Sequence, residues 1–335
     1  MALPSEPFNL KAVFITFDKE IRFFSAGALI MNKDVLLLKQ MLESESFDES
    51  VMREILSHYH DHPAIIPCSV LAGAKIIRSS TNDTKEFHND ISRLNYPPEK
   101  YARTDRASLK GKPMFYATVF TTAVKDNAYP RIFSAMETTE ILRDFQIEGR
   151  AFTTQSLWLS DRDLHLFAFP FSKKYKKPCA EITYQRKAWE QYFTEHWTED
   201  YIKFSEYMGD LMAEKAHSCL YDITANAINY ILYESDVASE FDGVMYPSFW
   251  GDGQGMNICL KKETVDECVH FKGASVQCID KHVGESTIFC IADSYQLPNG
   301  KLRWIPTQYA LSLLDNAFGI EKLIKQGTIV IETVK

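Results

Sequence analysis

The sequence lacks the patterns that would place it in a membrane or outside the cell. It contains no run of about 18 or more apolar residues, which is what a membrane-spanning helix needs. Its first residues, MALPSEPFNLKAVF, show no basic stretch followed by an apolar segment, so we expect no secretory signal. The seven cysteines form no CxxC pair, which favours scattered reduced thiols over a disulfide framework or a zinc ribbon. We therefore expect a cytoplasmic protein.

Basic charge and glycine-rich nucleotide loops are also scarce. The 37 basic residues are outnumbered by 45 acidic residues, for a formal charge of −8. Nucleic acid and anionic membranes are therefore not expected as partners. Neither GxGxxG nor GxxxxGK[ST] occurs, so the two commonest nucleotide-binding loops are absent. The GxSxG elbow of serine hydrolases is missing as well.

In the first third of the chain the sequence pattern changes from one typical of helices to one typical of strands. Residues 18–59 carry apolar residues at spacings of three and four, which predicts helices. Ser46 and Asp48 offer N-cap chemistry before the second of these helices. Residues 74–80 and 112–120 are rich in β-branched and aromatic residues, which predicts two strands.

Helices and strands continue to mix along the remaining chain. We expect helices at 131–145 and 186–235, strands at 151–161 and 163–171 joined by a hairpin turn at 160–163, two strands joined by a turn at Asn299–Gly300, and a final strand at 329–334. Strict βαβ alternation is absent, which favours an α+β (mixed α/β) fold. The division we expect is a mostly helical N-terminal extension at 1–70 and a catalytic domain at 71–335, with a helical insertion at about 186–235.

The segment HYHDHP places three histidines, His58, His60 and His62, close together. It resembles the HxHxDH signature of the metallo-β-lactamase fold with one residue missing, but it follows an expected helix where that family has a strand. A histidine run at a helix C-terminus is also stabilised by the helix dipole alone. We therefore expect no metal, and a metal-dependent hydrolase built on these histidines remains an alternative.

The segment YPSFWGDGQGMN, residues 246–257, follows an apolar strand with a serine fixed by a proline and then three glycines. Glycine permits positive φ and a close approach of the backbone to another group. This order is unusual for a plain surface loop, and it can be interpreted together with several sequence motifs upstream.

Several blocks occur in an order that resembles the RES-domain family, named for arginine, glutamate and serine. In chain order they are Arg78 after a short strand, Tyr96-Pro97-Pro98, Asp105-Arg106-Ala107-Ser108, Gly111 to Thr118 with Tyr116, Glu137 on a helix, and Tyr246-Pro247-Ser248 through Asn257. The resemblance covers roughly residues 74–265. It implies an ADP-ribosyltransferase-like RES core and an enzyme that consumes NAD. Some members are toxins held by an antitoxin, so the resemblance also makes an antitoxin or other protein partner an expectation.

The resemblance also implies roles for the matching residues. Arg78 and Arg106 would bind the pyrophosphate of NAD, for which planar guanidinium groups are suited. The Glu137 carboxylate would stabilise the positive charge that develops on the ribose when the nicotinamide bond breaks. Tyr116 would contact the nicotinamide ribose, and Ser248 the nicotinamide side.

Two further residues belong to the expected NAD site. Asn257 would tie the glycine loop back to its strand, and Tyr246 precedes the serine in the most specific block. No histidine base can be placed next to Ser248, so we do not assign it as a nucleophile.

The sequence departs from the family pattern at Asp105, where a glycine is expected. A carboxylate there would partly neutralise Arg106, which makes a catalytically silent nucleotide-binding module an alternative. Two assignments also have alternates. A helical wheel puts Glu140 nearer the buried stripe than Glu137, and Arg103 lies close to Arg106.

Overall fold

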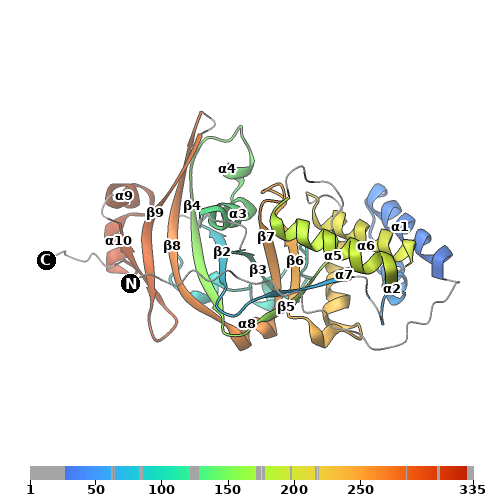
Figure 1. Cartoon of the computed structure of the whole chain (residues 1–335). Coiled ribbons are helices and arrows are strands. Elements are labelled where there is room, and N and C mark those ends of the chain that lie inside the picture. Colours follow the sequence, from blue (N-terminus) through green and yellow to red (C-terminus); the bar gives the residue numbers. More distant parts are fainter. Residues whose placement is uncertain are drawn as a thin grey trace.

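The computed structural model (Figure 1) describes residues 27–329, apart from 62, 64, 83–85, 121–127, 171–174, 176–177, 197, 216, 218, 284 and 308–309. Within these residues one ten-stranded sheet is combined with ten α-helices. The α+β class is therefore confirmed. Residues 18–26 and 330–334, where a helix start and a final strand were expected, lie outside the described residues.

The helices are α1 (Gly27–Glu43), α2 (Glu49–Ser57), α3 (Ala128–Thr138), α4 (Glu140–Arg143), α5 (Ala180–His196), α6 (Glu199–Met212), α7 (Leu220–Tyr233), α8 (Lys262–Cys268), α9 (Leu311–Phe318) and α10 (Ile320–Lys325). The strands are β1 (Ile66–Val70), β2 (Lys75–Thr81), β3 (Met114–Val119), β4 (Gly149–Ser160), β5 (Leu164–Ala168), β6 (Gly243–Pro247), β7 (Met256–Lys261), β8 (Val269–His282), β9 (Glu285–Gln296) and β10 (Leu302–Pro306). The sheet order is β1-β5-β6-β7-β3-β2-β4-β8-β9-β10, and only β5 and β6 run parallel.

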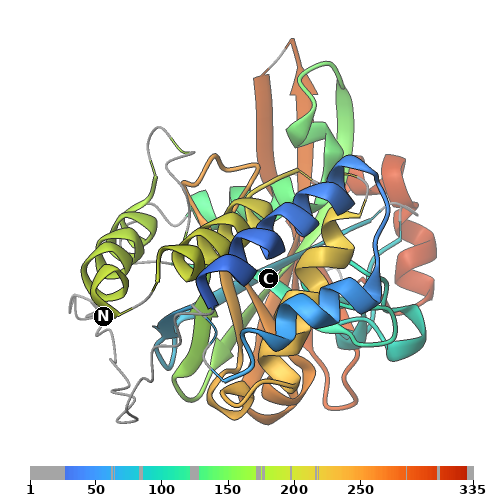
Figure 2. The same cartoon turned by 90° about the vertical axis from the view of Figure 1, so that its right-hand side faces the viewer.

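Helices gather at both ends of the molecule. Figures 1 and 2 show α1, α2, α5, α6 and α7 together at the end beyond β5 and β6, while α9 and α10 lie beside β9 at the other end. The helical segment expected at 186–235 thus consists of most of α5 together with α6 and α7. Asp48 caps α2, because its carboxylate accepts hydrogen bonds from the N–H groups of Ser50 and Val51 at 2.9 and 3.1 Å.

A long bent ribbon organises the sheet. Val70 lies opposite Leu164 and Lys75 lies opposite Leu159, so both chains advance by the same number of residues between the two strand pairs. The pairs β1–β5 and β2–β4 therefore form one continuous antiparallel ribbon with a bend. Gly73 lies at this bend with a φ of 76°, a conformation that favours glycine, and its N–H donates to the Ser160 carbonyl.

The bend corrects one sequence-based expectation. The residues at 160–163 do not form a hairpin, because β4 pairs with β2 and β8 while β5 pairs with β1 and β6. After β4, which pairs with β2, the chain continues into β5, which pairs with β1, and it bends instead of reversing. In addition, β1 belongs to this ribbon, so the boundary placed at residue 70 separates a sheet strand from β2, which continues it.

The strands β6, β7 and β3 lie between β5 and β2 and bring the candidate residues onto one face. Thr118 of β3 and Tyr246 of β6 both lie opposite Asn257 of β7, so their side chains share a face of the sheet. Helix α3 covers this face beside β2, where the Ser134 hydroxyl lies 2.9 Å from that of Ser79.

The sequence also predicted the turn between the last two strands of the sheet. The turn at Asn299–Gly300 is confirmed, since it joins the antiparallel strands β9 and β10 and Gly300 has a φ of 74°.

All seven cysteines lie among the described residues and are free thiols. In the part of the chain that the structure describes, no helix has the length and apolar character to cross a membrane.

Candidate functional site

Two residues from a distant part of the sequence meet at Glu137. Its Oε1 atom accepts a hydrogen bond from the Ser248 hydroxyl at 2.6 Å and one from the Asn257 side-chain amide at 2.9 Å. Glu137 comes from the end of α3, Ser248 from the residue after β6, and Asn257 from β7. The structure thus brings together three of the residues that the sequence singled out.

The partners of Glu137 are themselves fixed. The Thr118 hydroxyl donates to Asn257 Oδ1 at 2.8 Å, so the amide of Asn257 must turn its nitrogen toward the carboxylate. The Ser248 hydroxyl accepts the Gly251 N–H at 3.1 Å. Within the described residues, the other carboxylate oxygen of Glu137, Oε2, makes no hydrogen bond. The carboxylate is therefore held through one oxygen, and the other remains available.

The glycines of the loop after Ser248 allow aromatic rings of the protein to pack closely against the backbone. A Cβ atom on Gly255 would lie 2.4 Å from Phe133 Cδ2, and one on Gly251 would lie 2.8 Å from Phe133 Cδ1. A Cβ atom on Gly253 would lie 2.7 Å from the Tyr175 ring. The glycines thus make room for two aromatic rings of the protein itself, and the approach of a ligand to this loop stays a prediction. Phe133 and Glu137 lie four residues apart on α3, so both face the loop.

Tyr175 is a residue of this site that the sequence did not suggest. Its side chain is buried, and its hydroxyl has no hydrogen-bond partner among the described residues. Burial raises the pKa of Tyr175 above its usual value, and the charges of Arg106 and Glu137 also act on it. The hydroxyl therefore lies within electrostatic reach of both groups.

Arg106 is buried and binds the end of α6. Its Nη1 atom donates to the carbonyl of Met212 at 2.6 Å and to that of Leu211 at 3.3 Å, and Nη2 donates to the carbonyl of Glu214 at 2.8 Å. A cation at a helix C-terminus is favourable because unpaired carbonyls gather there. Binding of pyrophosphate by Arg106 remains a prediction, and it requires some of these hydrogen bonds to be exchanged.

Arg78 of β2 is held by β3, and the register places it on the sheet face opposite to Thr118 and Asn257. Its Nη1 atom donates to the Tyr116 carbonyl at 2.7 Å, and its guanidinium carbon lies 5.4 Å from the centre of the Phe115 ring. Burial lowers the pKa of Arg78 from its usual value. The Nε atom is buried without a hydrogen-bond partner in the described part of the chain. One donor of this guanidinium thus remains unsatisfied.

Tyr116 and Tyr246 lie near Arg106 and the loop that carries it. The Tyr116 hydroxyl accepts the N–H groups of Ala107 and Ser108 at 2.9 and 2.8 Å, which fixes the loop that carries Arg106. The Tyr246 ring is buried, and its centre lies 5.9 Å from the Arg106 guanidinium carbon. The contacts of Tyr116 support the loop, and its role at a ribose stays a prediction.

The charges of Arg106 and Arg78 both act on the carboxyl group of Asp105. Loss of solvent raises the pKa of its carboxyl, while a hydrogen bond from the Arg106 N–H and the charges of Arg106 and Arg78 oppose that rise. We take from this that the carboxylate lies within reach of both guanidinium groups, as the departure from the family pattern suggested.

The two alternate residues occupy less protected positions. Helix α3 ends at Thr138 and α4 begins at Glu140, so the single helical wheel that placed Glu140 in the buried stripe was wrong. Glu140 is exposed, and so is Arg103. Glu137 is the glutamate that meets Ser248 and Asn257.

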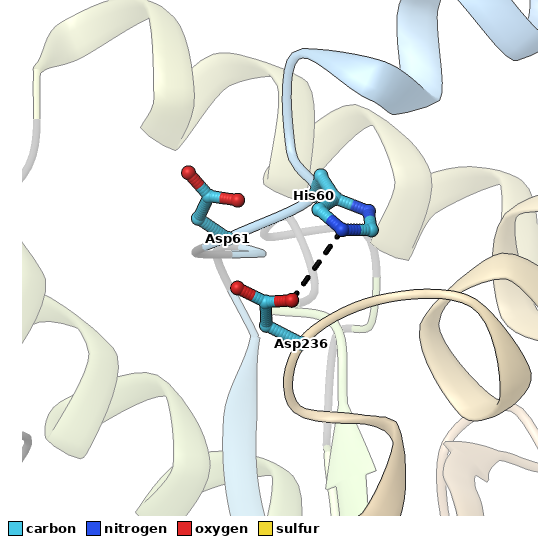
Figure 3. Close-up of side chains that lie close together, drawn as sticks. All are labelled: His60, Asp61 and Asp236. Atoms are coloured by element: carbon cyan, nitrogen blue, oxygen red, sulfur yellow. Dashed lines mark ion pairs between the residues drawn. The ribbon is translucent and has the colours of Figure 1, made fainter.

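The two described histidines of the cluster, His58 and His60, contact different partners. His58 Nδ1 lies 2.9 Å from Asp34 Oδ2, whereas His60 Nδ1 lies 2.9 Å from the Tyr230 hydroxyl. Figure 3 shows His60 with Asp61 and Asp236, whose ligand atoms lie within 4.8 Å of one another and which are at least partly exposed. His62 lies outside the described residues.

Comparison with known proteins gives no family for this chain. No protein-family model matches it, and no curated protein matches its sequence. The functional conclusion therefore rests on the site around Glu137.

Proposed function

We propose that this chain is an NAD-consuming enzyme of the RES type, which cleaves the bond between nicotinamide and ribose on an ADP-ribosyltransferase-like core. One observation carries the proposal. The Glu137 carboxylate is fixed through one oxygen by Ser248 and Asn257, and its other oxygen is available. Ser248 and Asn257, two residues of the family pattern that lie more than a hundred positions from Glu137, support that pattern by meeting at this carboxylate.

The chemistry needs a fixed negative charge. When the bond from ribose C1′ to the nicotinamide nitrogen breaks, the bonding electrons leave with nicotinamide and positive charge develops on the ribose. A carboxylate that is already oriented stabilises this charge without reorganisation. The available oxygen of Glu137 would supply it, either to the ribose carbon or through a ribose hydroxyl.

The acceptor of the ADP-ribosyl group distinguishes three related activities. Water gives an NAD glycohydrolase, phosphate an NAD phosphorylase, and a protein side chain an ADP-ribosyltransferase. A toxin role with an antitoxin as partner belongs to the same proposal, because a partner that covers the site would block access of NAD to Glu137.

A second candidate is a nucleotide-binding module that does not turn NAD over. Two observations favour it. Both terminal nitrogens of Arg106 are bonded to backbone carbonyls, and Asp105 lies within electrostatic reach of Arg78 and Arg106. Binding of NAD without release of nicotinamide would establish this candidate in place of the enzyme.

Release of nicotinamide by three forms of the full chain tests the proposal. The wild type should release it, Glu137→Gln should lose roughly a hundredfold or more in rate, as expected for loss of an oriented electrostatic group, and Glu140→Gln should remain within about twofold of the wild type, as expected for an exposed surface change. Glu140→Gln is a matched control because it makes the same substitution three residues away at an exposed position. A Glu137→Gln variant as fast as the wild type would overturn the assignment.

A further inference from the structure

Two cations lie against the side chain of Trp250, next to the candidate site. The guanidinium carbon of Arg143 lies 5.1 Å from the centre of the Trp250 ring system, and Lys215 Nζ lies 5.7 Å from it. Arg143 is the last residue of α4, Lys215 follows α6, and Trp250 belongs to the loop after β6. Since both cations contact one ring, their charges share one small area of the molecule.

This area is connected directly to Glu137. The residue after Trp250, Gly251, donates its N–H to the hydroxyl of Ser248, which in turn donates to Glu137. On the other side, Arg106 Nη2 donates to the carbonyl of Glu214, the residue before Lys215. The cations therefore lie where α4 and the end of α6 approach the loop of the candidate site.

Among the residues that the structure describes, no acidic side chain pairs with either cation. Within the described residues, Arg143 and Lys215 form no ion pair, whereas Arg150, Arg162 and Lys301 do. Arg143 is half-buried and Lys215 is exposed. Two like charges beside one ring repel each other, and an anion bound near both would lessen that repulsion.

We propose that Arg143 and Lys215 bind the phosphate groups of the ligand whose ribose faces Glu137, with Trp250 holding both side chains in place. This inference rests on the proposed function for the identity of the ligand, a dinucleotide with a pyrophosphate. It assigns the phosphates to side chains with free donors, in contrast to Arg106, whose terminal nitrogens are already bonded. Guanidinium and ammonium groups are both suited to phosphate oxygens.

The test compares two double variants of the full chain by calorimetry at low ionic strength. Arg143→Ala/Lys215→Ala removes the two cations beside Trp250. Arg303→Ala/Lys322→Ala removes the same two charges from exposed positions on β10 and α10, at the other end of the sheet. The probes are inorganic pyrophosphate, NAD, and nicotinamide riboside, which carries no phosphate.

For the first variant, we expect the Kd for pyrophosphate and for NAD to rise roughly tenfold, as expected for losing two partly exposed charge-assisted contacts. The Kd for nicotinamide riboside should stay within about twofold, as should every Kd of the control variant. Pyrophosphate binding that is absent in the wild type, or equally tight in both variants, overturns the inference. If pyrophosphate behaves as expected while NAD does not bind, the phosphate site stands and the proposed function fails.

Discussion

Replacing Ser248 with alanine tests the hydrogen-bond network around Glu137. The Ser248 side chain is fully buried, with 0% exposed, so water cannot take the place of its hydroxyl. That hydroxyl donates to Glu137 at 2.6 Å and accepts the Gly251 N–H at 3.1 Å. A hydrogen bond to a charged group contributes about 1.5–3 kcal/mol and a neutral one about 0.5–1.5 kcal/mol. Ser248→Ala should therefore lower the free energy of unfolding by about 2–4 kcal/mol.

Urea unfolding of the full chain measures this loss. Ser312→Ala is the control, because it makes the same substitution at an exposed position on α9 and should change the free energy of unfolding by less than about 0.5 kcal/mol. A loss of less than about 0.5 kcal/mol for Ser248→Ala would refute the network as described.

A double-mutant cycle with Glu137→Gln isolates the contact itself. We expect a coupling energy of about 0.5–3 kcal/mol between the two positions, as found for residues in one network. In turnover, Ser248→Ala should slow nicotinamide release roughly ten- to hundredfold, because Ser248 orients Glu137 and is not a nucleophile. Strictly additive free energies would show that the two side chains act independently.

The remaining predictions concern three other positions. Gly255→Ala should lower the free energy of unfolding by about 1–3 kcal/mol, since the added Cβ would lie 2.4 Å from Phe133 Cδ2; equal stability in urea would contradict this packing. Tyr175→Phe removes a buried hydroxyl that has no hydrogen-bond partner among the described residues, so the free energy of unfolding should stay equal or rise by up to about 1 kcal/mol. NAD affinity should fall in calorimetry, and unchanged affinity would exclude a ligand contact.

A hydrogen bond from Lys301 lowers the Asp90 pKa from 3.8 to about 2, so the stability it provides is present above pH 3.8 and lost as pH falls toward 2. Asp90→Asn should therefore cost about 1 kcal/mol at pH 7, after allowing for solvent screening, and the difference from the wild type should shrink in unfolding experiments below pH 3.8.

Local chemistry in the sequence predicts local structure well. Asp48 caps α2 because its carboxylate needs only the N–H groups two and three residues on, and Asn299–Gly300 turns the chain because glycine accepts a positive φ. The strands β2 and β3 could also be read from their β-branched and aromatic residues. The residues at 160–163 show the limit. Their composition is typical of a turn, but whether the chain reverses or bends depends on which distant strand pairs with β5.

The sequence likewise predicted some residues of the candidate site but not all of their contacts. The family-like order singled out Glu137, Ser248 and Asn257, and they meet in the structure. The partners of Arg106 could not be predicted, because the carbonyls of Leu211 and Met212 lie more than a hundred residues away and carry no side-chain signature.

The packing of the glycine loop could not be predicted for a related reason. A glycine can make room for a ligand or for a ring of the protein, and only the position of Phe133 distinguishes the two. The i, i+4 spacing of Phe133 and Glu137 on one helix was the signal available in the sequence, since it places both side chains on the same face.

The proposed cleavage of NAD is tested most directly by incubating the purified 335-residue chain with NAD, with and without phosphate, and following all products by mass. Cleavage at the nicotinamide–ribose bond predicts free nicotinamide together with ADP-ribose, a phosphorylated ADP-ribose, or a protein heavier by an ADP-ribosyl group, and the second product names the acceptor. NAD that remains intact under both conditions, at protein concentrations sufficient to detect a single turnover, would contradict it.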